Sequence, residues 1–175
     1  MKVDFAKVAV IAPYFAEHTE GLYVTKLLKL FYYLDFIAYK LRGASVTNDT
    51  YLKMPYGPVP SAIKNNIDLL SAENILGQEH KSKLSPYITL ERDEDGNGTR
   101  IISKGKDYNL RKLANFEINL MKNIAETFKD TRAKTLSNQT HREKPWASTS
   151  DLSVIDYSLA ESLVVEKILP TFSDK

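Results

Sequence analysis

The stretch from residue 24 to residue 42 constrains the fold of this chain more than any other feature. It reads VTKLLKLFYYLDFIAYKLR, and its apolar and aromatic residues lie almost all the way round a helix. Gly43 follows, and glycine is favoured in the left-handed conformation that ends many helices. The sequence therefore predicts a central helix over about 24–42.

The segments around this stretch predict a mainly α fold. Their apolar residues recur three or four positions apart, which is the spacing of a helix with one buried face. At 175 residues, without a repeat or a linker, the chain has the size of one domain. We expect a single compact helical domain over 1–175, with further helices over 4–17, 61–70, 110–128, 131–140 and 157–169.

One β-hairpin is predicted between these helices. Residues 87–92 and 99–103 alternate between apolar and polar side chains across the turn sequence DEDGNG. The resulting order of helix, helix, hairpin and helix loosely matches a winged helix, which makes a DNA-binding regulator of phage or prophage origin an alternative function. The segment 98–144 supports it with eleven basic against five acidic residues. The turn itself carries three acidic residues, at 93–95, and these would repel phosphate.

Residues 48–60, NDTYLKMPYGPVP, predict a stiff, shaped loop. Proline stands at 55, 58 and 60 around Gly57, which excludes a continuous helix and a central strand. One interpretation is that the loop presents Tyr56, Pro58 and Val59 to a partner, since a preorganised loop loses little entropy on binding. The alternative is that it only sets the angle between two helices, with Tyr56 buried and Gly57 required for its φ freedom.

The composition excludes most catalytic and metal chemistry. The chain has no cysteine, which rules out disulfides, thiol catalysis and Cys-ligated metals and fits a reducing cytoplasm. Its histidines, His18, His80 and His141, form no metal-binding pair. No nucleophile elbow and no Gly-rich phosphate loop is present. We therefore expect no enzyme activity, no metal and no cofactor.

Net charge and hydropathy limit the partners. With 24 basic and 22 acidic residues the formal charge is +2, so no strong nucleic-acid binding is expected. The most apolar stretch, 27–41, contains three charged residues and falls short of the roughly 20 apolar residues that cross a bilayer. The N-terminal residues lack a signal-peptide core. We expect a cytoplasmic protein with no membrane contact.

Asp35 is the most unusual residue of the predicted central helix. At 100° per residue it falls on the side of Leu28 and Phe31, where a carboxylate needs partners. It is either a functional acid or, as we favour, a buried aspartate satisfied by a helix cap or a basic or indole donor. The opposite side carries a stripe that is either a partner-contact face or simply solvated: Lys26, Lys29, Tyr33 and Lys40.

Two blocks of the sequence resemble a known family. The first spans residues 26–63 and reads KLLKLFYYLDFIAYKLRGASVTNDTYLKMPYGPVPSAI. It is similar to the signature of the Panacea domain, also described as SocA-like or phage-associated GepA-like. The second, LSNQTHREKPW over 136–146, resembles a downstream element of the same family. Phe31 replaces the family's usual leucine, and the first twenty residues match no motif. The matched positions are Lys26, Lys29, Tyr33, Asp35, Gly43, Tyr51, Gly57, Pro58, Val59, Pro60, Thr140, His141 and Trp146.

The resemblance implies a bacterial or phage-encoded antitoxin that binds a co-encoded protein toxin directly. Some relatives act as adaptors that deliver the toxin to a protease, and self-association stays open. No catalysis is implied. Among the matched residues and their neighbours we expect Tyr56, Pro58 and Val59 at the interface, with the stripe on the central helix as the next candidate. The expected internal supports are Asp35, Gly57, His141 and Trp146.

Overall fold

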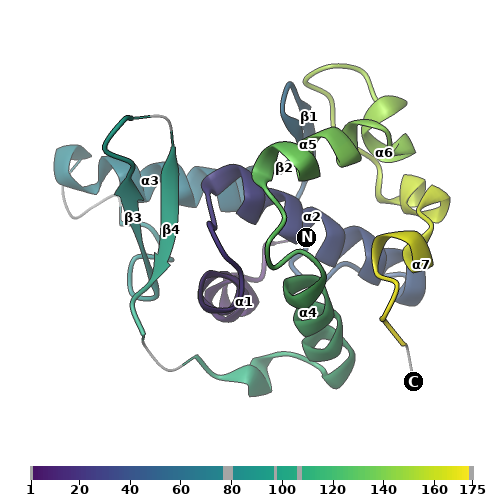
Figure 1. Cartoon of the computed structure of the whole chain (residues 1–175), viewed down its shortest axis with the longest axis horizontal. Helices are drawn as coiled ribbons and strands as arrows, with labels where there is room; N and C mark the ends of the chain where they lie inside the picture. Colours follow the sequence, from purple (N-terminus) through teal and green to yellow (C-terminus); the bar gives the residue numbers. More distant parts are fainter. Residues whose placement is uncertain (1, 77–80, 97, 106–107, 174–175) are drawn as a thin grey trace.

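The computed structural model describes residues 2–76, 81–96, 98–105 and 108–173 (Figure 1), so His80 lies outside the described residues. The fold is mainly α, as the sequence predicts. Figure 1 shows the β3–β4 hairpin at one end of the molecule and α6 and α7 at the other. The helices are α1 (Phe5–His18), α2 (Val24–Arg42), α3 (Ser61–Leu76), α4 (Asn115–Thr127), α5 (Ala133–His141), α6 (Lys144–Ala147) and α7 (Val165–Ile168), with 3₁₀ turns η2 (Leu110–Lys112) and η3 (Tyr157–Ser162). The strands are β1 (Tyr51–Met54), β2 (Gly57–Pro60), β3 (Ile88–Arg92) and β4 (Thr99–Ser103).

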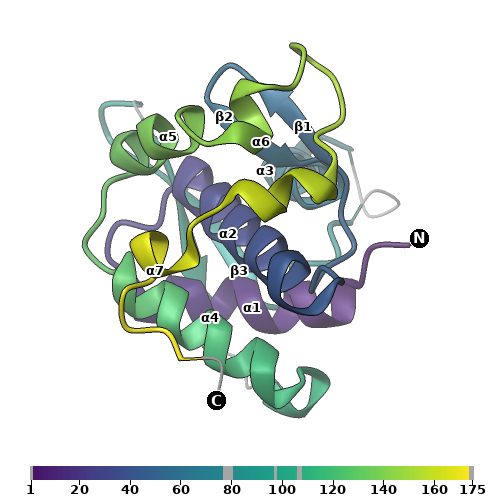
Figure 2. The same ribbon diagram turned by 90° about the vertical axis from the view of Figure 1, so that its right-hand side faces the viewer.

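The predicted central helix is α2. Every residue from Lys26 to Ala38 is buried, and Gly43 ends the helix with a φ of 71°. Figure 2 shows α2 running through the middle of the molecule, with α1 and α4 on one side and α5 and α6 on the other. The helix also contacts β2 and η3. Its apolar residues therefore find partners on all sides, which confirms the expectation drawn from its sequence.

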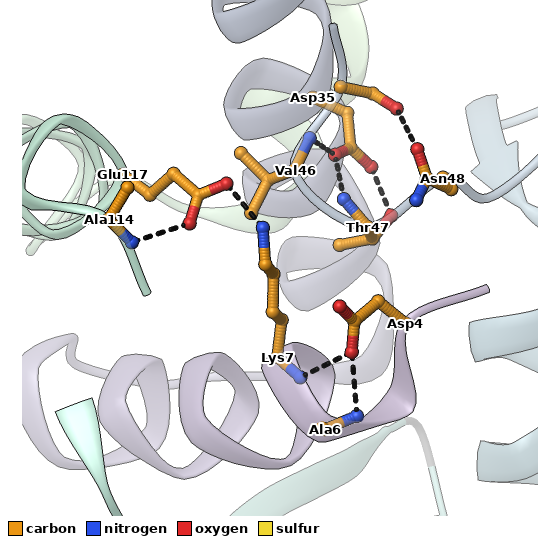
Figure 3. Close-up of polar contacts among 10 residues, drawn as sticks. Asp4, Ala6, Lys7, Asp35, Val46, Thr47, Asn48, Ala114 and Glu117 are labelled. Atoms are coloured by element: carbon orange, nitrogen blue, oxygen red, sulfur yellow. Dashed lines mark hydrogen bonds and ion pairs between the residues drawn. The ribbon is translucent and has the colours of Figure 1, made fainter. Parts of the chain in front are cut away.

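The first helix begins where its cap dictates. The Asp4 carboxylate accepts hydrogen bonds from the backbone N–H groups of Ala6 and Lys7, at 3.1 and 3.2 Å, and so satisfies donors that the helix leaves unpaired (Figure 3). The Lys7 ammonium reaches across to Glu117 of α4 at 2.5 Å. Glu117 also accepts from the Ala114 N–H at the start of α4, at 2.8 Å. The two helices that flank α2 on this side are thereby joined.

Two of the predicted helices are interrupted. The segment 110–128 consists of η2 and α4, and 157–169 consists of η3 and α7. The breaks fall at Leu113 and Leu163, which have extended backbone and are 5% and 3% exposed. Helical spacing alone does not reveal that an apolar residue is buried from an extended conformation. Between the predicted helices over 131–140 and 157–169, where no helix was expected, Lys144–Ala147 form α6, because proline is well tolerated in the first turn of a helix.

Residues 51–60 form a second antiparallel hairpin, so the prediction of a loop here and of only one hairpin is wrong. Leu52 pairs with Val59, and Met54 pairs with Gly57. The Lys53 N–H points the other way, to the Ser153 carbonyl at 2.9 Å. Along β2, backbone N–H groups point alternately toward β1 and away from it. Pro58 and Pro60 occupy the positions that point away, so the N–H groups they lack belong to the outer edge of β2. That edge position is where a strand accommodates proline.

The hairpin β3–β4 matches its prediction. Its five residue pairs run from Ile88 with Ser103 to Arg92 with Thr99. It packs on α1 and is fixed by the Ile101 N–H, which donates to the Leu22 carbonyl at 2.8 Å. No helix of the described residues is long and apolar enough to cross a membrane.

Candidate functional site

The β1–β2 hairpin, residues 51–60, is held at its tip by three side chains from three helices. We call it the Tyr56 hairpin after the residue at its turn. Backbone carbonyl groups need hydrogen-bond donors, and three of those in this hairpin find a donor in a side chain of another element. The Met54 carbonyl accepts from the Trp146 indole of α6 (3.0 Å), the Tyr56 carbonyl from the Ser137 hydroxyl of α5, and the Pro58 carbonyl from the Lys29 ammonium of α2 (3.0 Å).

Lys29 lies beneath the turn. Its side chain is 1% exposed, and Gly57 packs directly on it. A Cβ atom on Gly57 would lie 2.5 Å from Lys29 Cε and 2.8 Å from Thr140 Oγ1, and the φ of Gly57 is +107°. Glycine is therefore required here for both space and backbone conformation. Burial lowers the pKa of Lys29 to about 7.

A stack of three side chains supports the other side of the hairpin. The His141 and Trp146 rings are stacked with their centroids 4.0 Å apart, and the Lys53 ammonium lies 4.2 Å from the centre of the Trp146 ring. Burial, followed by the charges of Lys29 and Lys53, lowers the pKa of His141. Among the described residues, no group hydrogen-bonds the buried Nε2 atom of His141. At neutral pH this imidazole is an uncharged packing surface.

Asp35 joins α2 to the chain that leads into β1. The carboxylate is fully buried and accepts hydrogen bonds from the N–H groups of Val46 and Thr47, both at 2.8 Å (Figure 3). The hydroxyls of Thr47 and Tyr51 donate to it at 2.5 and 2.8 Å. Burial raises the pKa of Asp35 to about 6, although the four hydrogen bonds act in the opposite direction. The expected burial is confirmed, and its donors are backbone amides and hydroxyls rather than a basic or indole group.

Sequence reasoning missed two further carboxylates. Asp49 is 2% exposed and caps α3, where it accepts from the N–H groups of Ala62 and Ile63 at 3.0 and 2.8 Å. Glu143 accepts from the hydroxyls of Tyr32 and Tyr33, at 2.9 and 3.0 Å. Burial raises the pKa of Glu143 to about 7. Asp49 lies in the first of the two family-like sequence blocks and Glu143 in the second, and this position was the only indication in the sequence that they matter.

The expected exposed stripe on the central helix does not exist as such. Lys26, Lys29 and Tyr33 are each at most 1% exposed, because α2 is enclosed all round. Lys26 extends its stem through the interior and donates to the carbonyls of Glu20 and Lys129, both at 2.8 Å. Lys40 alone is partly exposed, and its ammonium donates to the carbonyl of Glu161 at 2.7 Å. Both predictions for this stripe, a partner-contact face and a solvated face, are therefore wrong for Lys26, Lys29 and Tyr33.

A groove with a volume of about 360 Å³ opens beside the Tyr56 hairpin, and we call it the hairpin groove. Tyr56 is 76% exposed and Val59 is half-buried at its edge, whereas Pro58 is buried and does not line it. Val154, which is 59% exposed, forms a β-bridge with the lining residue Leu52. Lys64 and Asp68 pair with one another at its rim. The apolar lining comes from Val24, Leu28, Leu52, Met54, Tyr56 and Val59.

The stability of the protein should rise with pH between about 7 and 9 because of Lys29. In the unfolded chain this amine titrates at its ordinary value of 10.5, and in the folded protein at about 7. The unfolded chain therefore binds more protons in this interval, and the free energy of unfolding increases by about 2 kcal/mol through Lys29 alone. Urea unfolding at pH 7, 8 and 9 should show that Lys29→Met removes this part of the slope. Lys134→Met, at an exposed position, should retain the wild-type slope; equal slopes in both variants would contradict the prediction.

The comparison with protein families identifies the family of this chain. The model of the family described as antitoxin SocA-like, Panacea domain, matches residues 27–147, which are 121 of the 175 residues. This range contains nearly all of α2, the Tyr56 hairpin and α5 and α6 in full. No curated protein and no solved structure matches the chain. Because the matched range exceeds half of the chain, the protein belongs to the SocA-like antitoxin family defined by the Panacea domain.

Proposed function

We propose that this protein neutralises a protein toxin encoded beside it by binding the toxin at the hairpin groove. Family membership supports an antitoxin role and a binding rather than a catalytic activity. The observation that carries the choice of surface is Tyr56, which is 76% exposed at the end of a hairpin fixed by three hydrogen bonds. Exposed aromatic residues on rigid supports are frequent energetic centres of protein interfaces.

The chemistry of the hairpin groove indicates what it contacts. Its lining is mostly apolar, with the buried Lys29 beneath it, and Lys64 and Asp68 pair with each other at 2.6 Å. An apolar centre with a polar rim is the usual composition of a protein interface. We therefore expect an apolar side chain of the toxin to insert beside Tyr56 and Val59. Little conformational entropy is lost on the antitoxin side, since the hairpin is already ordered.

Truncating Tyr56 should strongly weaken neutralisation without unfolding the protein. Removing an aromatic anchor of an interface typically weakens binding by roughly 2 kcal/mol, which is about 30-fold in Kd. Tyr56→Ala and Val59→Asp are expected to fail in a growth-rescue assay with the co-expressed toxin. Titration calorimetry with the purified toxin should give the weaker Kd, while the melting temperature of Tyr56→Ala stays within about 2 °C of the wild type, as expected for an exposed site.

Ile102→Ala is the matched control, because Ile102 is an exposed apolar residue on the other hairpin, at 38% exposure. It should rescue growth fully. Folded Tyr56 and Val59 variants that also rescue growth would remove the hairpin groove from the interface. The half-life of the toxin in cells distinguishes blocking from delivery to a protease, because only delivery shortens it.

The alternative of a DNA-binding regulator gains no support from the β3–β4 hairpin. Arg100, a basic residue of this region, is paired with Asp93 at 3.1 Å. Asp93 also accepts from the Tyr23 hydroxyl at 2.7 Å. These contacts keep an acidic group at the turn, where a wing would meet the phosphate backbone.

A further inference from the structure

A second and larger groove lies between α5, α6 and α7, with a volume of about 680 Å³. Figure 2 shows the positions of α5, α6 and α7. We call it the α5–α7 groove. It shares no lining residue with the hairpin groove. Neither the family match nor the proposed toxin contact assigns it a role.

The charges of the α5–α7 groove are strongly unbalanced. Arg142, Lys144 and Lys167 line it, and all three are exposed. Within the described part of the chain, none of these side chains forms a hydrogen bond or an ion pair. The one acidic residue in the lining is Glu143, whose two carboxylate oxygens accept from Tyr32 and Tyr33 on α2. Glu143 is thereby directed toward the core, and the mouth of the groove is left with unpaired positive charge.

The floor of the same groove is apolar. Leu163 and Ile168 form it with Val164, which is 46% exposed although it is a large aliphatic residue. Uncharged polar side chains from α5 complete the wall, namely Thr135, Asn138 and Gln139. Amide and hydroxyl groups of this kind donate to and accept from peptide groups. The groove therefore combines positive charge, an apolar floor and peptide-compatible polar groups.

We propose that the α5–α7 groove binds an acidic segment of a partner protein that also carries apolar side chains. Charge complementarity selects the carboxylates, which would pair with Arg142, Lys144 and Lys167 at the mouth. The exposed Val164 and the floor beneath it select the apolar side chains between those carboxylates. A nucleic-acid backbone would satisfy the charges but leave this apolar surface without a partner. The occupant is for this reason a peptide.

Fluorescence anisotropy with a synthetic probe tests this assignment. The probe is a fluorescein-labelled peptide of alternating glutamate and leucine, and two matched peptides replace either every glutamate with lysine or every leucine with serine. We expect saturable binding of the first peptide, at least tenfold weaker binding of the serine peptide, and no binding of the lysine peptide. The double variant Arg142→Glu/Lys167→Glu should weaken binding of the first peptide at least tenfold, and Val164→Ser several-fold.

Two control variants locate the effect. Lys134→Glu reverses an exposed charge on α5 outside the groove and should change the Kd less than twofold. Tyr56→Ala should bind the peptide like the wild type, so that this result stands apart from the test of toxin binding. Circular dichroism checks that each variant is folded.

Three outcomes would overturn the proposal. One is equal binding by the wild type and the double charge-reversal variant. Another is equal affinity for the leucine and serine peptides, which would mean attraction by charge alone. The third is tighter binding of duplex DNA than of the peptide, lost in the same double variant, which would assign the groove to nucleic acid.

Discussion

Replacing Asp35 with alanine should lower the free energy of unfolding by about 3 kcal/mol and the melting temperature by about 10 °C. The reason is that four buried donors lose their acceptor at once. Two are backbone N–H groups, of Val46 and Thr47, and two are the hydroxyls of Thr47 and Tyr51. A buried donor without a partner costs about 1–3 kcal/mol, and relaxation around the same residue makes the four costs less than additive. Thermal unfolding followed by circular dichroism measures the change.

Asp4→Ala is a matched control for Asp35→Ala. It also removes a carboxylate that accepts from two backbone N–H groups, but at the partly exposed start of α1, where water can replace it. Its expected cost is about 1 kcal/mol, which is typical for the loss of a helix cap. Asp35→Asn, which keeps one acceptor oxygen, should fall between the two. An unchanged melting temperature in Asp35→Ala together with complete loss of neutralisation would instead make Asp35 part of the binding site.

Gly57→Ala should destabilise the protein by about 3 kcal/mol and displace the tip of the Tyr56 hairpin. The added methyl group would lie 2.5 Å from Lys29 Cε and 2.8 Å from Thr140 Oγ1, which are shorter than van der Waals contacts. Alanine is also strained at a φ of +107°. Because Trp146 donates to the carbonyl of Met54 in the same hairpin, its fluorescence should report the displacement. Tryptophan stands at no other position of the chain.

Gly96→Ala separates the two causes. Gly96 has a φ of +72°, but apart from its chain neighbours no atom of the described residues lies within 4 Å of the position that its Cβ would occupy. Its substitution should cost about 1 kcal/mol from backbone strain alone, without a change in Trp146 fluorescence. If Gly57→Ala melts at the same temperature as Gly96→Ala, the contact with Lys29 and Thr140 is not a tight one. Loss of growth rescue by Gly57→Ala at a temperature where it is folded would further support binding at the hairpin.

Features set by neighbouring residues were predictable from the sequence. The apolar residues almost all round 24–42 predicted a central helix, and Gly43 placed its end. Alternation over 87–92 and 99–103 predicted β3 and β4 nearly to the residue. The burial of Asp35 followed from its place on the same side of the helix as Leu28 and Phe31. In each case the signal is the spacing of side chains along one element, which depends only on the local backbone geometry.

The second hairpin shows where such spacing fails. Proline at 55, 58 and 60 argued against a central strand and for a loop, because proline lacks a ladder donor. In the fold, two of these prolines fall on the outer edge of β2, and β1 gains another neighbour in residues 152–155, where the Ile155 N–H donates to the Tyr51 carbonyl at 2.8 Å. Which edge of a strand is free depends on segments about 100 residues away. No pattern within 48–60 contains that information.

The sequence by itself determined the central helix, the hairpin β3–β4 and the absence of cysteine chemistry, and its two motif blocks indicated the family. The tertiary structure alone decided that Lys26, Lys29 and Glu143 are internal rather than surface groups. The sequence placed Lys29 on a helix face, whereas in the fold its ammonium donates to the Pro58 carbonyl. Glu143 accepts hydrogen bonds from Tyr32 and Tyr33, which lie more than 100 positions away in the sequence. The physical reason is that the state of a charged group depends on the dielectric and the donors or acceptors around it. Those surroundings are brought together only by the folding of distant segments.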